Sequence, residues 1–318
     1  MTRPVVAVVG ATATGKTALA VALARRLDGE IINADSRQVY RGMDIGTAKP
    51  AAAERKAVRH WLIDVANPDE RFSLAMYLDA AHAALSDIWS RDKLPLVVGG
   101  TGQYVWALLE GWRVPRVPPD RALRAELEAL AAREGPAAVM DILRAEDPAS
   151  AAAIDARNLR RMVRAIEVTR ATGRPFSAWQ QKDAPSFAAA IVGLRIDRAR
   201  LYARIDARVD AMITAGLVDE VRRLNAAGYG CDLPSMQSIG YREICAHLRG
   251  ELTLDAAVAR IKTETHRLAR MQHTWFRATD ERIRWLDAES PTLLPDALTA
   301  LASKQRDRVS EPADRLMD

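Results

Sequence analysis

Cysteine is nearly absent from this chain of 318 residues, which contains only Cys231 and Cys245. Neither lies in the closely spaced pattern of cysteines and histidines that a zinc site requires, so a cysteine-ligated metal site is excluded. We expect both to be ordinary reduced thiols in a cytoplasmic protein.

Long hydrophobic runs are also lacking. The sequence has no 18 consecutive apolar residues, which excludes a helix that spans a membrane. The first ten residues, MTRPVVAVVG, lead straight into an apolar segment and leave no room for a signal peptide. We therefore expect no association with a membrane.

Neither sign of charge dominates. Hydrophobic residues make up 49% of the chain and charged residues 27%, and the net charge is +5, a balance typical of soluble globular proteins. This mild positive charge permits a polyanionic partner such as a nucleic acid but does not require one. A chain of this length can bury a large core and is expected to hold two structural parts.

One segment, VVAVVGATATGKT at residues 5–17, predicts a phosphate-binding loop. Five small or β-branched residues predict a strand buried on both faces, and a helical pattern begins after the turn. Backbone N–H groups from Thr12 to Thr17 would bind a di- or triphosphate or a pyrophosphate, Lys16 would add positive charge, and the Thr17 hydroxyl would reach a magnesium ion. The loop itself consists of Gly10, Ala11, Thr12, Ala13, Thr14, Gly15, Lys16 and Thr17.

Two further apolar stretches, residues 30–34 and 94–100, predict buried strands. Residues that follow parallel strands gather at one edge of the sheet, so Asp35 is expected beside the phosphate loop. An Asx turn or a helix cap remains the alternative role for Asp35. The second strand leads into Thr101 through two glycines, without the acid found in an ATPase. A third apolar stretch, residues 60–65, predicts another short strand, and we interpret its Asp64 as structural.

A helical region follows the proline-rich segment at residues 114–119. It predicts three helices, at residues 120–133, 136–145 and 157–172, with no strands between them. From residue 157 to 174 there are six arginines against Glu167 alone. A solvated charged face and a surface for nucleic-acid phosphates are equally open interpretations.

The rest of the chain predicts a strand at residues 189–196, several helices including a long basic one at 254–279, and an edge strand at 282–286. The expected fold is therefore an α/β P-loop fold of the nucleotide-kinase kind, a parallel sheet with a helical insertion. Its expected parts are residues 1–113 and 187–302 for the core, 114–186 for the insertion, and 303–318 for a disordered tail.

Five segments together resemble the bacterial tRNA dimethylallyltransferases. They are GATATGKT, ADSRQVYRGMDIGTAKP, LVVGGTGQY, RRMVRAIEV and LPSMQSIGYREI, and they span Gly10 to Glu243 in the order of that family. One departure is Ala11, where the family usually has proline, which affects the stiffness of the loop more than any ligand.

The resemblance implies transfer of a dimethylallyl group from dimethylallyl diphosphate to N6 of the adenosine 3′ of the anticodon, position 37 of tRNAs that read codons beginning with U. It implies Asp35 as the base, with Lys16, Thr101 and Arg208 completing the catalytic set and Mg²⁺ bound through Thr17. We expect a monomer whose partners are dimethylallyl diphosphate and the anticodon stem-loop of tRNA. The implied tRNA contacts are Asp35, Ser36, Arg37, Gln38, Thr101, Arg160, Arg161, Met162, Val163, Arg164, Gln237, Ser238, Ile239, Gly240, Tyr241 and Arg242.

Two other functions compete with this one. A small-molecule kinase of the P-loop fold would use the arginine-rich helix as a lid over ATP. A nucleotide-gated RNA-binding module would have no catalytic activity. Labelled dimethylallyl diphosphate or labelled ATP, incubated with unmodified tRNA, separates the three.

Overall fold

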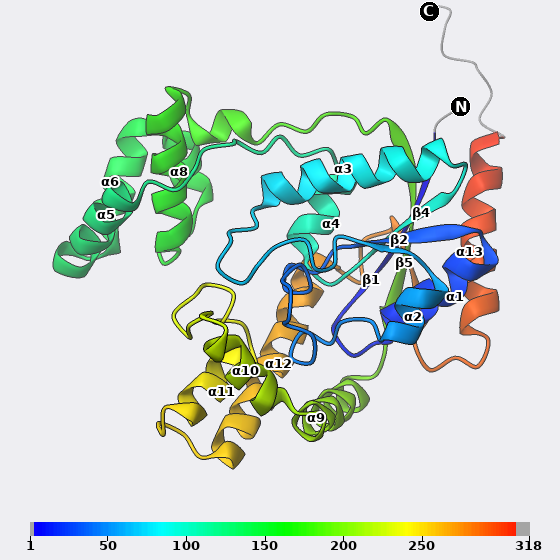
Figure 1. Ribbon diagram of the computed structural model, residues 1–318. Helices are drawn as coiled ribbons and strands as arrows, with labels where there is room; N and C mark the ends of the chain where they lie inside the picture. Colours follow the sequence, from blue (N-terminus) through cyan, green and yellow to red (C-terminus); the bar gives the residue numbers. More distant parts are fainter. Residues whose placement is uncertain (1–2, 310–318) are drawn as a thin grey trace, which may run out of the picture. The chain divides into compact units, whose positions relative to one another are not determined.

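The computed structural model describes residues 3–309 of the chain. Within them, six parallel strands form one sheet in the order β3-β2-β4-β1-β5-β6 (Figure 1). The predicted α/β fold and the predicted edge strand are confirmed. The strands are β1 (Arg3–Gly10), β2 (Gly29–Asn33), β3 (His60–Trp61), β4 (Leu94–Val98), β5 (Phe187–Arg195) and β6 (Ile283–Asp287).

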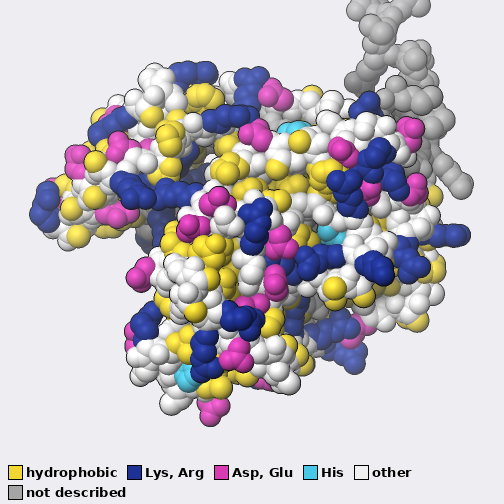
Figure 2. All heavy atoms as spheres, viewed as in Figure 1, with side chains coloured by type: hydrophobic (Ala, Val, Ile, Leu, Met, Phe, Trp, Pro, Cys, Tyr) yellow, Lys and Arg dark blue, Asp and Glu magenta, His cyan; other side chains and the backbone are white. Residues whose placement is uncertain are grey.

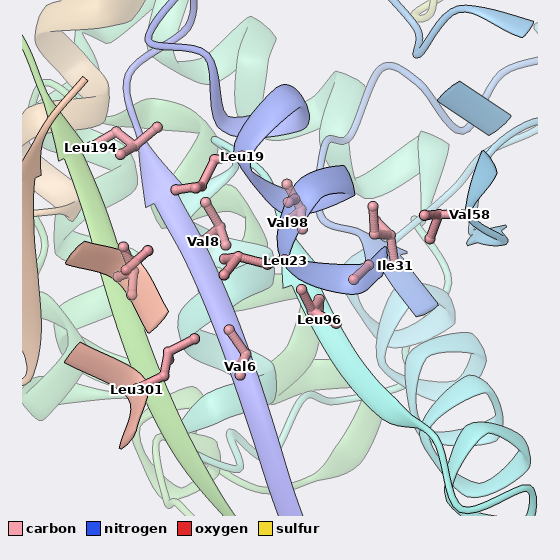
Figure 3. Packing of buried hydrophobic residues seen from close by; sticks show 14 residues of the cluster. Val6, Val8, Leu19, Leu23, Ile31, Val58, Leu96, Val98, Leu194 and Leu301 are labelled. Atoms are coloured by element: carbon pink, nitrogen blue, oxygen red, sulfur yellow. The ribbon is translucent and has the colours of Figure 1, made fainter. Parts of the chain in front are cut away.

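Helices cover both faces of this sheet. On one face, α1 (Lys16–Arg26) and α13 (Leu293–Val309) pack together. Leucines of α1 meet alternate valines and leucines of β1 and β4, and α13 packs against β5 and β6 (Figure 3). On the other face, α3 (Leu74–Ser90) packs against β2 and β4, with α4 (Gly102–Leu109) beside it. Because both faces are covered, β1 is buried from Val5 to Gly10, as its uninterrupted apolar pattern predicts.

A group of helices surrounds a second hydrophobic cluster after β5. This cluster includes Val209, Val221, Ile244 and Ile261. Outside this group, the short α2 (Ala52–Ala57) lies before β3. The helices of the group are α9 (Arg198–Thr214), α10 (Leu217–Ala226), α11 (Tyr241–Leu248) and α12 (Leu254–Trp275).

The chain divides into two compact units. The first contains β1 to α4 and β5 to α13, and the second is Glu110–Pro185. The second unit is entirely helical apart from its loops and has its own core, built around Leu127, Leu143 and Ile166. Its helices are α5 (Arg121–Glu134), α6 (Pro136–Glu146), α7 (Pro148–Ala153) and α8 (Leu159–Thr172), followed by a 3₁₀ turn at Phe176–Trp179.

Three expectations about local structure need correction. Helix α13 continues to Val309, so the expected disordered tail is wrong for residues 303–309, while residues 310–318 lie outside the described part. Strand β3 is shorter than the apolar stretch 60–65 because Leu62 and Asp64 adopt positive φ angles. Helix α7 was not predicted, since it is short and follows directly on α6.

The expectation of two reduced thiols is also wrong for this structure. Cys231 and Cys245 form a disulfide, with their Cα atoms 5.9 Å apart. The turn after Gly230 brings Cys231 against the buried side of α11, within the usual distance range for such a bond. Their separation of 14 residues gave no sign of this pairing, because it depends on how the intervening loop folds.

Positively and negatively charged side chains lie close to one another. In Figure 2, Lys and Arg side chains are interspersed with Asp and Glu over the visible face. Many of these form ion pairs, for example Arg91 with the buried Glu30. Among residues 3–309, no helix combines the length and the apolar character needed to cross a lipid bilayer.

Candidate active site

The phosphate-binding loop connects β1 to α1. Gly10 has a φ of 139° and Gly15 a φ of 89°, values that residues other than glycine rarely adopt. A Cβ atom on Gly10 would also lie 2.7 Å from the carbonyl oxygen of Leu194. Both glycines are therefore required by the backbone. Helix α1 begins at Lys16, two residues before the helical pattern that the sequence predicted after the loop.

Contacts within the loop fix its conformation. The Thr14 hydroxyl donates to the Ala11 carbonyl at 2.9 Å, and Lys16 Nζ donates to the same oxygen at 2.6 Å. The N–H of Thr12 donates to Gln272 Oε1 at 2.7 Å. The expectation that Thr12 contributes an N–H to the ligand therefore needs correction, since a side chain from α12 already accepts that hydrogen bond.

A cavity of about 280 Å³ adjoins this loop, and several predicted site residues line it together. They include Lys16 and Thr17 from the start of α1, Asp35 and Gln38 from the segment after β2, and Arg208 from α9. Their sequence positions differ widely, but the parallel topology places the ends of β1 and β2 at the same edge of the sheet, on either side of β4. The prediction that Asp35 lies beside the phosphate loop is confirmed.

Asp35 is held by its neighbours in sequence. Its Oδ1 accepts a hydrogen bond from the Arg37 N–H at 2.8 Å, which is the Asx turn considered as an alternative. Asn33, 5% exposed, accepts from the Asp35 N–H and donates to the Asp35 and Leu62 carbonyls. The turn and the functional role are therefore compatible, because the turn orients a carboxylate that still lines the cavity.

Two cations interact electrostatically with Asp35. Burial lowers the pKa of Lys16 to about 8, Asp35 opposes this shift, and nearby Arg208 adds to it. Burial also lowers the pKa of Arg208, and Asp35 again opposes the shift. Beside the Asp35 carboxylate the cavity thus holds two desolvated cations, a setting suited to an anionic phosphate ligand.

Thr101 supports the Asp35 segment from β4. Its Oγ1 accepts from the Ser36 N–H at 3.0 Å and lies 3.3 Å from the Ser36 hydroxyl, and its own N–H donates to the Ala34 carbonyl. Thr101 does not line the cavity described above. In this structure it therefore positions the segment that carries Asp35.

The segment 237–242 contains both exposed and buried side chains. Gln237 and Arg242 are exposed, whereas Ser238 and Tyr241 are buried. The Tyr241 hydroxyl donates to Glu220 at 2.6 Å, and the Ser238 hydroxyl donates to the Ser235 carbonyl. The expectation of tRNA contacts through the side chains of Ser238 and Tyr241 is therefore corrected, since both pack within the protein.

Glu220 organises the loop between β2 and α2. It is 2% exposed and accepts hydrogen bonds from the backbone N–H groups of Asp44, Ile45 and Gly46, besides that from Tyr241. A Cβ atom on Gly46 would lie 2.4 Å from the Tyr241 ring. This explains the glycine in the GMDIGTAKP segment, which continues into the cavity wall at Thr47, Ala48 and Pro50.

The predicted site residues of helix α8 likewise include both buried and exposed side chains. Met162 and Val163 are buried in the core of the helical unit, so tRNA contacts through their side chains are also corrected. Arg164 pairs with the buried Glu167 and donates to the carbonyls of Pro115 and Val117, so it stabilises the unit.

The other arginines of this helix differ in their partners. Arg157, just before the helix, pairs with Asp155, and Arg170 within it pairs with Glu146. Arg160 and Arg161 are exposed, and neither forms an ion pair with any side chain that the structure describes, which are those of residues 3–302. The two remain the arginines of α8 whose charge is available to an anionic partner.

Three residues that shape the site were not predicted. Asn33 was a polar residue inside an apolar strand, and this was the only local signal. Glu220 and Gln272 lie on helices far along the chain, and neither belongs to a motif with a known chemical role. Apart from the Tyr241 hydroxyl that donates to Glu220, their partners are backbone groups, which no pairing of side-chain types could indicate.

The fold and the cavity define a P-loop protein in which the phosphate loop lies beside a carboxylate. A family model described as IPP transferase matches residues 38–279 of the chain. The chain belongs to the IPP transferase family, and the resemblance seen in the sequence is confirmed.

Relatives match over nearly the whole length. The chain is 52% identical over 296 residues to the tRNA dimethylallyltransferase of Roseiflexus sp. (strain RS-1), covering 93% of this chain and 97% of that protein. Among solved structures, the full-length tRNA isopentenylpyrophosphate transferase of Bacillus halodurans shares 39% identity with a TM-score of 0.72, covering 97% and 98% of the two chains. A eukaryotic dimethylallyltransferase acting on tRNA shares 26% identity with this chain at a TM-score of 0.81, and the match covers 98% of this chain and 81% of the eukaryotic chain.

Proposed function

We propose that this chain transfers a dimethylallyl group from dimethylallyl diphosphate to N6 of adenosine 37, 3′ of the anticodon, in tRNAs that read codons beginning with U. The N6 lone pair forms a bond to C1 of the donor, the C1–O bond breaks, and its electron pair leaves with diphosphate. The amine proton passes to Asp35. The observation that carries this proposal is that one cavity holds both the phosphate loop and the Asp35 carboxylate.

The phosphate end of the cavity suits the leaving group. N–H groups from Ala13 to Thr17, together with Lys16 and Arg208, face the charge that grows on diphosphate as the C1–O bond breaks. Apolar side chains of Pro50, Ile63 and Val98 line the same cavity. They match a short branched hydrocarbon chain.

Asp35 suits the role of general base. An exocyclic amine is a weak nucleophile because its lone pair is delocalised into the ring, so removing its proton during attack accelerates the reaction. The hydrogen bond from the Arg37 N–H fixes one carboxylate oxygen, which leaves the other to accept the proton.

The residues present fit a magnesium ion bound with the donor. Thr17 and Asp35 line the cavity, and no cluster of three acidic, histidine or cysteine residues occurs among residues 3–309. Magnesium typically keeps several waters and binds few protein groups besides substrate phosphates. When bound through the Thr17 hydroxyl, it would neutralise charge on the diphosphate.

Transfer RNA is the acceptor in this proposal because relatives at 52% identity are named tRNA dimethylallyltransferases. The exposed cationic and polar residues Arg160, Arg161, Gln237 and Arg242 are the side chains offered to it. The target base must leave its stack to reach Asp35. We further propose a cytoplasmic monomer.

Two features disfavour the kinase alternative. Strand β4 leads into Gly99, Gly100 and Thr101 without an acidic residue. Asp64, the acid that follows β3, is paired with Lys49 and Arg55. Neither position therefore offers the free carboxylate that binds magnesium in P-loop ATPases.

Labelled dimethylallyl diphosphate and unmodified tRNA test the proposal. We expect label to enter tRNA only when magnesium is present, with inorganic diphosphate competing against the donor. Release of phosphate from ATP in the presence of tRNA, with no label in the RNA, would support a kinase or ATPase instead.

A further inference from the structure

Gln272 of α12 bridges two loops that border the cavity. Its side-chain oxygen accepts from the Thr12 N–H at 2.7 Å, and its side-chain nitrogen donates to the Gly100 carbonyl at 3.1 Å. The residue is 8% exposed. The orientation of the amide is determined by its neighbours, since a backbone N–H lies on one side and a carbonyl on the other.

Packing around the bridge leaves it little freedom. A Cβ atom on Gly100 would lie 2.2 Å from the Gln272 nitrogen, so this position needs glycine to admit the amide. One turn earlier on α12, the buried Ala269 belongs to the same cluster as Ala11 of the phosphate loop. Helix α12 therefore contacts the loop through two successive turns.

The bridge also leads to the carboxylate. Gly100 is followed by Thr101, whose hydroxyl accepts from the Ser36 N–H beside Asp35. A single amide thus connects the loop that binds the leaving group with the segment that carries the base. Because the Thr12 N–H is directed to Gln272, the N–H groups that remain for the donor's phosphates are those further along the loop.

We propose that Gln272 is a positioning residue that sets the spacing between the phosphate loop and the β4–α4 loop, and with it the placement of the donor's diphosphate relative to Asp35. This inference rests on the proposed function. Glutamine suits the position because it supplies one acceptor and one donor from the same planar group.

The first test replaces Gln272 with methionine, which keeps its approximate volume and removes both hydrogen bonds. We expect the KM for dimethylallyl diphosphate and the Kd for inorganic diphosphate with magnesium each to rise about 10-fold, since two buried polar groups lose their partners. The KM for tRNA should stay within about twofold. The exposed Gln180 of the helical unit gives a matched control, Gln180→Met, with all three values unchanged.

The second test uses Gln272→Glu and does not depend on the methionine variant folding. An ionised carboxylate would face the Gly100 carbonyl, whereas a protonated carboxyl can donate to it and still accept from Thr12. Burial raises the pKa of such a carboxyl above its usual value of about 4.3. We therefore expect activity relative to wild type, measured at each pH, to recover as the pH falls from about 8 to about 5.5.

The outcomes separate the two proposals. Wild-type protein that binds diphosphate but does not prenylate tRNA would overturn the proposed function. Wild-type protein that prenylates tRNA, together with Gln272→Met binding diphosphate as tightly as wild type or with a Gln272→Glu ratio independent of pH, would overturn the positioning role.

Discussion

At the scale of single residues, the site depends on Asp35 and the two cations that interact with it. Lys16 and Arg208 are both desolvated, and both are stabilised in their charged forms by Asp35. A bound diphosphate would interact with the same cations. The carboxylate and the ligand therefore contribute in the same direction to keeping Lys16 protonated.

Asp35→Asn should nearly abolish prenyl transfer while tRNA binding stays within a few-fold. The amide keeps the oxygen that accepts from the Arg37 N–H but cannot take the proton from N6, and losing a general base typically costs about 10²–10⁴ in rate. Single-turnover rates and tRNA Kd values provide the measurement, with the exposed Asp69→Asn as control. A variant that keeps most of its rate would show that Asp35 is not the base.

The affinity for diphosphate should fall as the pH rises above about 8. The lowered pKa of Lys16, about 8, means that its ammonium is charged below this pH and is lost above it. Since the ligand binds the charged form, the Kd for inorganic diphosphate should rise towards about tenfold per pH unit. Calorimetric titrations between pH 6.5 and 9.5 should show this for wild type and for Lys56→Ala, but not for Lys16→Ala. A flat wild-type profile would exclude Lys16 as the titrating cation.

At the scale of secondary-structure elements, α8 carries some arginines that stabilise the helical unit and others that are exposed. Arg164 contacts the buried Glu167 and two backbone carbonyls, while Arg160 and Arg161 are exposed. An arginine-rich helix therefore combines paired and exposed arginines, which its sequence pattern does not separate.

Replacing Arg160 and Arg161 together with alanine should weaken tRNA binding and flatten its salt dependence. Each lost phosphate contact should lower the slope of log K against log salt by roughly 0.7–0.9. Binding isotherms across a salt series measure this, with Arg133→Ala on α5 as control. If the slope of the double variant equals that of wild type, the two arginines form only a solvated face.

Helices α10 and α11 stabilise the loop of residues 42–49 through Glu220. Glu220→Gln should lower the free energy of unfolding by about 2–3 kcal/mol, because hydrogen bonds to a buried charged acceptor are lost and an amide donor faces backbone N–H groups. Denaturant unfolding measures this change, and Asp219→Asn, one residue earlier and exposed, should change it little. Equal stabilities of the two variants would contradict the role assigned to Glu220.

At the scale of the whole molecule, the sequence predicted what depends on local pattern. The apolar strands, the glycine-rich turn and the parallel order of the sheet placed Asp35 beside Lys16 correctly. The contacts made by Gln272 and Glu220 could not be predicted, because each joins a distant helix to backbone groups of a loop. The disulfide was missed because it depends on how the loop between Cys231 and Cys245 folds. The buried side chains within site motifs, such as Tyr241 and Met162, were missed because a motif does not show which of its members face inward.

The central claim is that the cavity joins a prenyl donor to an adenosine of tRNA. Mass spectrometry of nucleosides from unmodified tRNA, incubated with the protein, magnesium and dimethylallyl diphosphate, tests it most directly. We predict an adenosine that has gained one dimethylallyl group, located 3′ of the anticodon, and none with Asp35→Asn. Unmodified adenosine throughout, with phosphate released from ATP in a parallel reaction, would contradict the claim.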